Sequence, residues 1–485
     1  MIWRPISGNG KKLKTKKKKN RQIMVITWSF TLLFLAMTVY MVQYSVSHKQ
    51  EMINNSYNGR QQMLLAQNRR GKILSASGDV LAQTIEDEEG KEVREYPYGT
   101  LFSHVVGYAV NGKMGVESQS NYYLINSNAP LPQKASLDVQ NEKYPGDDVY
   151  TTLDVNLQQV ASTALGVYRG AIIVTEPKTG KILAMVSKPD FEPSEVEQNW
   201  DTYLADNDSG VLLNRATQGQ YPPGSTFKII TSLEYIKEHP DNYQNYTYQC
   251  VGSMKWGEDR IQCYHGTVHG VVDFKKSFAK SCNTSYANIG LSLDRNKFGD
   301  TLDTLLFNQK LPVSFPSSVS KLEVSDETAD SDMMQISIGQ GSASITPLQL
   351  NMITCAIANE GKLMKPYVVD CVKNSAGNTI KEFKPSVYGN LMTGKEAEIM
   401  SELMKDVVEE GTATRLKGLS YTAAGKTGSA EYGAIKGESH AWFTGFAPAE
   451  DPQICVTIII EGAGAGGDYA VPIAKRVFDA YLVNT

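Results

Sequence analysis

An uncharged stretch of 22 residues, Ile23 to Tyr44, is the feature that most limits how this 485-residue chain folds. Its only interruptions with strongly polar side chains are Thr, Ser and Gln. At about 1.5 Å per residue, a helix of this length reaches about 33 Å, enough for the roughly 30 Å hydrocarbon core of a bilayer. Ser45-Val46-Ser47 resembles a signal-peptidase site, but the stretch is long for a cleaved signal, whose core is about 7–15 residues. We therefore predict an uncleaved transmembrane anchor at residues 22–45.

The charge of the chain changes sign at this stretch. Residues 1–21 hold nine Lys or Arg and no acid, so the net charge of −4 leaves −13 for everything that follows. A buried core helix would leave the polylysine run beside it unexplained, whereas the positive-inside rule explains it directly. We expect residues 1–21 to be a basic cytoplasmic tail, the rest of the chain to lie outside the membrane, and no nucleic acid to be a partner.

Beyond the anchor, residues 46–146 read as a polar stalk followed by a small, mostly β module broken by Gly, Pro and charged patches. Regular patterning begins at residue 147, with a hairpin signature around Pro177-Lys178-Thr179-Gly180. Helical patterns dominate from Phe227 to about Ala358, strands return over residues 421–461, and residues 471–482 form a last amphipathic helix. Strands at both ends with helices between them predict, for residues 147–485, an α+β domain whose sheet is assembled from distant segments and packed against helices.

Three short motifs follow one another in this domain: Ser225-Thr-Phe-Lys228, Ser281-Cys282-Asn283 and Lys426-Thr427-Gly428. Each motif alone is common, and Ser225 after Pro-Pro-Gly also looks like an ordinary helix cap. The ordered set within about 200 residues is the one found in β-lactamases and penicillin-binding proteins.

The chemistry explains this set. A serine hydroxyl is a weak nucleophile until a base removes its proton, and residues three apart on a helix share a face, so Lys228 can reach Ser225. To act as a base, Lys228 must be neutral, which requires burial or a nearby positive charge such as a helix N-terminus or Lys426. Ser281 and Asn283 are spaced to point the same way from an extended loop, and residues 426–429 predict an edge strand that pairs with an extended peptide.

Copies of these motifs elsewhere are interpreted as structural. Ser277–Lys280 lies within a predicted helix, Ser318–Lys321 lies in a Ser-rich loop, and neither is followed at a suitable distance by both partner motifs. A second Lys-Thr-Gly at 178–180 precedes the serine and falls in the hairpin turn.

Six cysteines lie beyond the anchor, at 250, 263, 282, 355, 371 and 455. Outside the membrane, Cys250 and Cys263 have the spacing for a disulfide that closes a short loop. The same two cysteines with His265 and His269 make a nominal zinc quartet, but the close-spaced cysteine pairs of zinc sites are missing. A Cys250–Cys263 disulfide is therefore possible, and we expect neither a metal nor another cofactor.

The external region resembles the class B penicillin-binding proteins, which are single-pass peptidoglycan transpeptidases. Besides the three motifs, the resemblance rests on seven segments: "NRRGKIL" (68–74), "GVE" (115–117), "TLDVNLQ" (152–158), "NRATQGQYPPGSTFK" (214–228), "SIGQGSASITPLQL" (337–350), "VVEEGTATRL" (407–416) and "AWFTGFAP" (441–448). It departs from the family at Ser75–Asp79, "SASGD", where an Asp-Arg-Asn-Gly-like stretch is common.

The resemblance implies the fold of serine β-lactamases and penicillin-binding transpeptidases, and a role for each motif residue. Ser225 would attack the penultimate D-alanine of a stem peptide ending in D-Ala-D-Ala and form an acyl-enzyme, with Lys228 as base and Ser281 and Lys426 handling protons. Asn283 would hold the acyl amide of the substrate. The strand Thr427-Gly428-Ser429 would hold its terminal carboxylate. The backbone N–H groups of Ser225 and Ser429 would form the oxyanion hole.

The resemblance further implies that β-lactams acylate Ser225. It also implies that glycan strands are polymerised by a partner, by analogy a multi-pass polymerase of the SEDS type, because no separate polymerising domain is recognised in the sequence. Three other functions stay open. A β-lactamase is disfavoured because no Glu-x-x-Leu-Asn segment lies between Asn283 and Lys426. A D,D-carboxypeptidase differs only in using water as acceptor, and a β-lactam sensor or scaffold would keep the fold without turnover.

Overall fold

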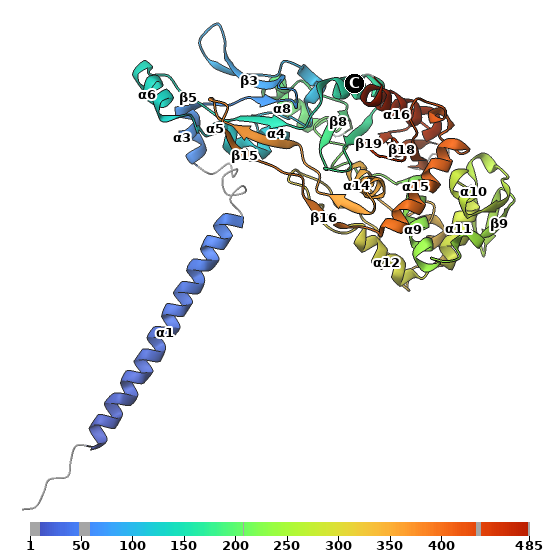
Figure 1. Cartoon of the computed structure of the whole chain (residues 1–485), viewed down its shortest axis with the longest axis horizontal. Coiled ribbons are helices and arrows are strands. Elements are labelled where there is room, and N and C mark those ends of the chain that lie inside the picture. The colour runs from blue at the N-terminus through green and yellow to red at the C-terminus, as the bar shows by residue number, and fades with distance from the viewer. Residues whose placement is uncertain (1–9, 48–58, 207, 433–437, 484–485) are drawn as a thin grey trace, which may run out of the picture. The chain divides into compact units, whose positions relative to one another are not determined.

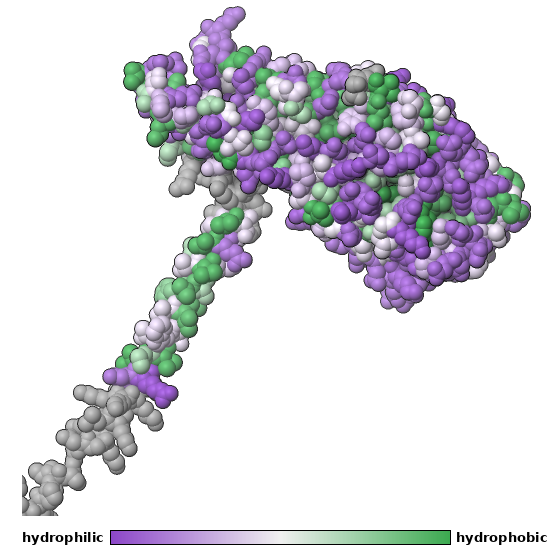
Figure 2. Space-filling model, viewed as in Figure 1, coloured by the Kyte–Doolittle hydropathy of each residue, from purple (hydrophilic) through white to green (hydrophobic). Residues whose placement is uncertain are grey.

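The computed structural model describes residues 10–47, 59–206, 208–432 and 438–483, and these fall into two units, 1–64 and 65–485. The first unit holds helix α1 (Gly10–Ser47), whose segment from Asn20 to Ser47 is long and apolar enough to cross a membrane. Its apolar side chains from Ile23 to Tyr44 are all exposed, and Figure 2 shows the hydrophobic surface that they give the helix. The predicted apolar segment thus forms one helix long enough to span a membrane, while residues 1–9 of the basic tail and 48–58 of the stalk lie outside the described residues.

The second unit, preceded along the chain by helix α3 (Arg60–Gln67), contains a sheet that joins distant parts of the sequence (Figure 1). Its six strands lie in the order β15-β14-β6-β2-β3-β4. They are β2 (Ile73–Leu74), β3 (Val80–Glu86), β4 (Glu92–Glu95), β6 (Asp148–Thr151), β14 (Val369–Lys373) and β15 (Thr379–Glu382). Strands from both sides of residue 147 therefore share one sheet, and β14 and β15 lie in a region where the sequence predicted no strands.

Short helices complete the N-terminal part of this unit. They are η1 (Gly99–Phe102), α4 (Gly115–Gln119), α5 (Asn121–Ile125) and α6 (Leu131–Gln140), and β1 (Asn68–Arg69) pairs with β5 (Tyr144–Pro145). In the "SASGD" segment, which differs from the usual family sequence, Asp79 accepts hydrogen bonds from the hydroxyls of Ser75 at 2.8 Å and Ser77 at 2.6 Å. These bonds close the turn between β2 and β3.

Three buried charges hold this part together. Glu117 of "GVE" is completely buried and accepts hydrogen bonds from Arg70 Nη2 at 2.5 Å and Arg94 Nε at 2.7 Å. Burial raises the pKa of Glu117, but the charges of Arg70 and Arg94 outweigh this effect and hold the pKa below its ordinary value. Two of the sequence segments on which the resemblance rests thus meet in one buried ion cluster.

A second, five-stranded antiparallel sheet has the order β17-β18-β19-β7-β8. Its strands are β7 (Gly170–Thr175), β8 (Ile182–Lys188), β17 (Ala424–Glu431), β18 (Ser439–Ala447) and β19 (Ile454–Ile460). The hairpin of β7 and β8 was predicted, and so was the edge position of the strand that carries Lys426. Every residue of β18 and β19 is buried, so both faces of the sheet are covered.

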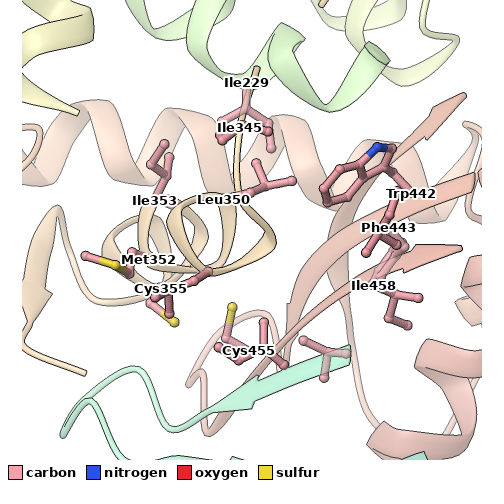
Figure 3. Close-up of a cluster of buried hydrophobic side chains, with 14 of the residues drawn as sticks. Ile229, Ile345, Leu350, Met352, Ile353, Cys355, Trp442, Phe443, Cys455 and Ile458 are labelled. Carbon is pink, nitrogen blue, oxygen red and sulfur yellow. The ribbon is translucent and has the colours of Figure 1, made fainter. Parts of the chain in front are cut away.

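Helices cover these two faces. α7 (Val155–Leu165) and α16 (Gly466–Leu482) pack on each other and on the sheet, while α14 (Pro347–Ala358) packs against β7, β18 and β19. Figure 3 shows this core, in which Leu350 and Ile353 of α14 gather with Ile229, Phe443 and Ile458. The structure confirms the predicted α+β architecture, an antiparallel sheet between layers of helices.

The helical region of this unit contains most of the remaining elements. They are η2 (Pro193–Glu195), α8 (Val196–Ala205), η3 (Gly224–Phe227), α9 (Lys228–Glu238), η4 (Tyr243–Asn245), α10 (Phe274–Ala279), α11 (Asn283–Ser292), α12 (Arg295–Thr304), α13 (Asp330–Ile336), α15 (Gly394–Glu409) and η6 (Thr414–Leu416), with β13 (Lys362–Met364) pairing with β16 (Val387–Asn390).

Helices dominate from Phe227 to about Ala358, as predicted, except between residues 247 and 273. Four short strands lie there, β9 (Thr247–Cys250), β10 (Ser253–Trp256), β11 (Asp259–Gln262) and β12 (Gly270–Asp273), and η5 (Tyr264–Gly266) lies between β11 and β12. Strands of four residues bury too few side chains to leave a clear alternating pattern in the sequence.

The Glu117 cluster makes the stability of the N-terminal part testable. Glu117→Gln is expected to lower the free energy of unfolding by about 3 kcal/mol, because it leaves two buried guanidinium groups without their counter-charge. The measurement is urea unfolding of the detergent-solubilised full chain. Glu86→Gln is the matched control, since Glu86 pairs with Arg69 at the surface, and we expect a change below about 1 kcal/mol. Equal effects of the two substitutions would contradict the assignment.

Candidate active site

The nucleophile candidate Ser225 lies in η3, which leads directly into α9. Gly224 before it has a φ of +53°, and a Cβ at this position would lie 2.8 Å from the carbonyl oxygen of Ser429 on β17. Only glycine therefore lets the turn approach the strand this closely. Trp442 Nε1 also donates a hydrogen bond to Pro222 O at 3.1 Å. The Ser225 side chain makes no cap hydrogen bond for η3 or α9, so the helix-cap interpretation is wrong for the hydroxyl.

Lys228 lies one turn after Ser225, and its side chain is completely buried. Its Nζ is 3.2 Å from Ser225 Oγ and 3.1 Å from Ser281 Oγ. Two shorter contacts, each 2.7 Å, join Nζ to the carbonyl oxygen of Ser281 and to Asn283 Oδ1. The structure thus brings the first two sequence motifs together at a single amine.

These contacts fit a neutral amine. A neutral amine has two N–H donors, and the two shortest contacts lead to oxygens that only accept. Its single lone pair is then left to accept a proton from one hydroxyl, and the hydroxyls of Ser225 and Ser281 lie 3.2 and 3.1 Å away. Burial lowers the pKa of Lys228 to about 7, against a smaller opposing effect of Cys282 and Cys263. Burial, rather than the helix N-terminus or Lys426, is thus the main cause of the shift that the sequence required.

Lys426 of β17 completes the cluster. Its side chain is also completely buried, and its Nζ donates to Ser281 Oγ at 3.0 Å and to Thr427 O at 3.1 Å. Burial, and second the charge of Lys228, lower the pKa of Lys426 well below its ordinary value. Ser281 Oγ therefore lies between two amines and connects them by hydrogen bonds, as a proton relay must.

Ser281 and Asn283 reach this point by a different backbone from the predicted extended loop. Ser281 has a left-handed φ of +54°, Cys282 is the N-cap of α11, and Asn283 is the first residue of that helix. The Asn283 side-chain amide accepts from Lys228 and donates from Nδ2 to Gln262 O at 3.0 Å. The sequence predicted the convergence of the two side chains correctly, but not the strained turn that produces it.

Thr427, Gly428 and Ser429 continue β17, which pairs with β18 and lies at the edge of the sheet. The hydroxyls of Thr427 and Thr412 form a hydrogen bond at 2.5 Å, and Ser429 Oγ accepts from the N–H of Gly466 at 3.4 Å. A cleft of about 580 Å³ lies beside Asn283 and Ser429. The edge strand and this cleft leave room for an extended chain beside Asn283 and Ser429.

The motif copies that were interpreted as structural are engaged elsewhere. Ser277 Oγ accepts a hydrogen bond from Ser285 in the core, and Ser318 Oγ donates to Gln218 O. Lys178 of the second Lys-Thr-Gly pairs with Asp451 at the surface.

Each of the six cysteines, all among the described residues, is a free thiol. Cys250 Sγ and Cys263 Sγ lie 3.7 Å apart, so the disulfide that the sequence allows is not formed in this structure. His265 is not part of the group of side chains around these sulfurs, whereas His269 and Cys282 are.

Sequence reasoning gave no role to several residues that support the site. Arg215 Nε donates to Glu461 Oε1 at 2.7 Å, and the hydroxyl of Tyr221 donates to the same oxygen at 2.8 Å. This anchors the segment before the nucleophile to the end of β19. The centre of the Tyr286 ring lies 5.3 Å from Lys228 Nζ, and the centre of the Phe278 ring lies 5.6 Å from Lys426 Nζ. Arg215 and Tyr221 lie within the "NRATQGQYPPGSTFK" segment, which was the available signal.

Comparison with known proteins agrees with this geometry. Residues 170–479 match the model of the penicillin binding protein transpeptidase domain, and residues 70–149 match that of the penicillin binding protein A dimerisation domain. The chain is 31% identical to the peptidoglycan D,D-transpeptidase MrdA of Acinetobacter baumannii, over 82% of this chain and 67% of that protein. It is 30% identical to the peptidoglycan D,D-transpeptidase PbpA of Mycolicibacterium smegmatis, over 85% of this chain and 89% of that protein.

Solved structures extend the likeness to most of the chain. The penicillin-binding protein A of M. tuberculosis in its ceftriaxone acyl-enzyme complex has a TM-score of 0.78 at 26% identity, covering 86% of this chain and 99% of that one. A D,D-transpeptidase domain from Eggerthella lenta has a TM-score of 0.77 at 29% identity, covering 86% of this chain and 98% of that one. The two buried lysines beside Ser225 and Ser281 make this cluster the candidate acyl-transfer site of a serine enzyme on this fold. The chain belongs to the penicillin-binding protein transpeptidase family.

The burial of Lys228 predicts how acylation depends on pH. Since its pKa is lowered to about 7, the base is protonated below that pH and free above it. The rate of acylation by a fluorescent penicillin should therefore rise through pH 7 and fall by about tenfold for each unit below it. Lys228→Arg, which keeps the charge at every pH, should lose at least about a hundredfold in this rate. A rate independent of pH in this range would contradict the role of Lys228.

Proposed function

We propose that this chain is a membrane-anchored peptidoglycan D,D-transpeptidase that works through a Ser225 acyl-enzyme. The observation that carries the proposal is the continuous contact path from Ser225 Oγ through Lys228 and Ser281 to Lys426, in which both amines are completely buried. A path of this kind both takes the proton from a nucleophile and delivers one to a leaving group.

In the acylation half-reaction, Ser225 Oγ attacks the carbonyl carbon of the penultimate D-alanine while its proton moves to Lys228. The bond to the terminal D-alanine then breaks, and the leaving nitrogen receives a proton from Ser281, which Lys426 and Lys228 re-supply. In the second half-reaction an amine of a neighbouring stem peptide attacks the ester and regenerates the Ser225 hydroxyl. The products are one cross-link and one free D-alanine.

The rest of the site holds the substrate. The backbone N–H groups of Ser225 and Ser429 are proposed as the oxyanion hole, which is supported by the close packing of Gly224 on Ser429. The stem peptide would add to the free edge of β17, with Thr427 and Ser429 holding the terminal carboxylate and Gly428 letting η3 approach. Asn283 Nδ2 would break its hydrogen bond with Gln262 O and donate to the acyl group of the substrate instead.

We propose a cytoplasmic tail at 1–21, an anchor at 22–45, a stalk and pedestal at 46–146 and a transpeptidase domain at 147–485 outside the membrane. The basic tail beside an apolar helix supports this topology. Cross-linking requires nascent glycan strands, so we further propose a membrane-embedded glycan polymerase of the SEDS type as partner, by the family resemblance.

The first experiment tests the nucleophile. Ser225→Ala should abolish covalent labelling of the full chain by fluorescent penicillin, because it removes the hydroxyl that is proposed to attack the β-lactam carbonyl beside Lys228. Intact-protein mass spectrometry measures the adduct. Ser318→Ala is the matched control, since Ser318 also precedes a lysine by three residues, and it should label normally. Labelling of Ser225→Ala, or no adduct on the native chain with any of several β-lactams, would overturn the proposal.

The second experiment separates a transpeptidase from a D,D-carboxypeptidase or a sensor without turnover. The full chain is incubated with a donor peptide ending in D-Ala-D-Ala and an amine acceptor peptide, and products are separated by chromatography. We expect a coupled peptide together with released D-alanine. Release of D-alanine without coupling would identify a carboxypeptidase, and β-lactam labelling without any release would identify a sensor.

A further inference from the structure

Two aromatic rings lie against the pair of buried lysines. Lys228 Nζ lies over the Tyr286 ring, 5.3 Å from its centre, and Lys426 Nζ lies over the Phe278 ring, 5.6 Å from its centre. Both aromatic side chains are completely buried, and the centres of their rings are 6.5 Å apart. A cation within about 6 Å of a ring centre is attracted by the negative face of the ring. The two rings thus form one aromatic surface beside both amines.

The turn that carries Ser281 fixes the two helices from which these rings come. Phe278 belongs to the last turn of α10, and Tyr286 belongs to the first turn of α11. Between them, the N–H of Ser281 donates to Phe278 O at 3.1 Å, and the N–H of Cys282 donates to Ser277 O at 2.9 Å. These two bonds are the pattern that closes a helix with a left-handed residue, here Ser281 with a φ of +54°. The turn that brings Ser281 to the lysines therefore also sets the place of the rings.

The lysine pair has no acidic partner in the part of the chain that the structure describes. The titratable groups that act on Lys228 are the thiols of Cys282, at the N-cap of α11, and Cys263, at the end of β11, and the group that acts on Lys426 is Lys228. The oxygens that contact the two amines are all uncharged and belong to Ser225, Ser281, Asn283 and Thr427. An isolated ammonium in such a place is costly. When Lys228 takes a proton, a buried cation therefore forms without a carboxylate beside it.

The hydroxyl of Tyr286 is engaged elsewhere. It forms a hydrogen bond of 2.6 Å with Ser232 Oγ, and Ser232 follows Lys228 by one turn of α9. Burial raises the pKa of Tyr286, so its phenol stays neutral. Tyr286 therefore offers Lys228 the face of its ring, and neither a proton donor nor a phenolate.

We propose that Tyr286 is a positioning residue whose ring stabilises the ammonium form of Lys228 during acyl transfer, in place of a carboxylate. The inference rests on the proposed function, in which Lys228 takes the proton of Ser225. In that step the O–H bond of Ser225 breaks and an N–H bond forms on Lys228, so positive charge appears 5.3 Å from the ring centre. A carboxylate at the same place would hold the lysine in its protonated form, and the base would be lost. A ring attracts the charge more weakly and so leaves the amine able to release its proton.

The ring and the burial act on Lys228 in opposite directions. Burial lowers the pKa of Lys228 to about 7, whereas the ring favours the charged form. Without the ring the pKa of Lys228 should fall further, and the midpoint of the acylation rate against pH should move to lower pH. Loss of packing alone would do the opposite, because water entering the space would solvate the ammonium form and raise the pKa. The direction of the movement thus separates the ring from a side chain that only fills space.

The test measures the rate of acylation by fluorescent penicillin against pH, with the full chain in detergent. Tyr286→Leu should move the midpoint down by about one pH unit. It should also lower the plateau rate roughly threefold, because a weaker base removes the Ser225 proton more slowly. Tyr286→Phe keeps the ring and loses only the hydrogen bond with Ser232, so its midpoint should stay at the native value.

Phe274→Leu is the matched control. Phe274 is also buried on α10, and its ring packs against Tyr235, while no lysine lies over it among the described residues. The loss of this ring removes a similar volume from the core, so the midpoint should not move.

A further variant keeps the size of the ring and weakens its negative face. Trifluorinated phenylalanine in place of Tyr286 has nearly the volume of phenylalanine, because fluorine is small, but fluorine withdraws charge from the ring. Relative to Tyr286→Phe, it should move the midpoint down by roughly half a pH unit. This comparison decides the question even where Tyr286→Leu does not fold.

Three results would overturn the inference. The first is a midpoint that stays or moves up in folded Tyr286→Leu, and the second is an equal midpoint for phenylalanine and its trifluorinated form. The third is a downward movement in both Tyr286→Phe and Ser232→Ala, which would assign the effect to the hydroxyl. Failure of the proposed function looks different, because the native chain would then not be labelled at Ser225 at any pH.

Discussion

The active site depends on one constraint, the burial of two lysine amines in a place where water does not solvate them. Lys228 and Lys426 are both completely buried, and their Nζ atoms share the hydroxyl of Ser281 at 3.1 and 3.0 Å. Two ammonium groups this close would repel each other strongly in a medium of low polarity. The fold therefore lowers both pKa values, and the free energy that this requires comes from the packing of the large hydrophobic core around the site.

That core also explains why three motifs distant in sequence meet at one point. Gly224 packs on Ser429, and a Cβ at Gly339 would lie 2.0 Å from the carbonyl oxygen of Gly224. The loop with Gly339 thus presses η3 against the edge strand from the other side. Side chains at these two positions would separate the turn with Ser225 from the strand with Lys426, and the lysine pair would no longer share one hydroxyl.

Much of this arrangement was predictable from local sequence because catalytic groups on helices and strands leave short, regular spacings. Ser225–Lys228 follows from one helical turn, and Lys426–Ser429 from a strand whose neighbours are small and apolar. The anchor is equally local, since 22 uncharged residues have few alternatives. The relative placement of the three motifs came only from the family resemblance, because no spacing in the sequence encodes contacts over 145 residues such as that of Lys426 with Ser281.

The errors have a physical pattern as well. β9 to β12, β14 and β15 are short strands, and β14 also pairs with the distant strand β6, so their own composition carries little signal. The positive φ of Ser281 is invisible in the sequence, because serine has no preference for it.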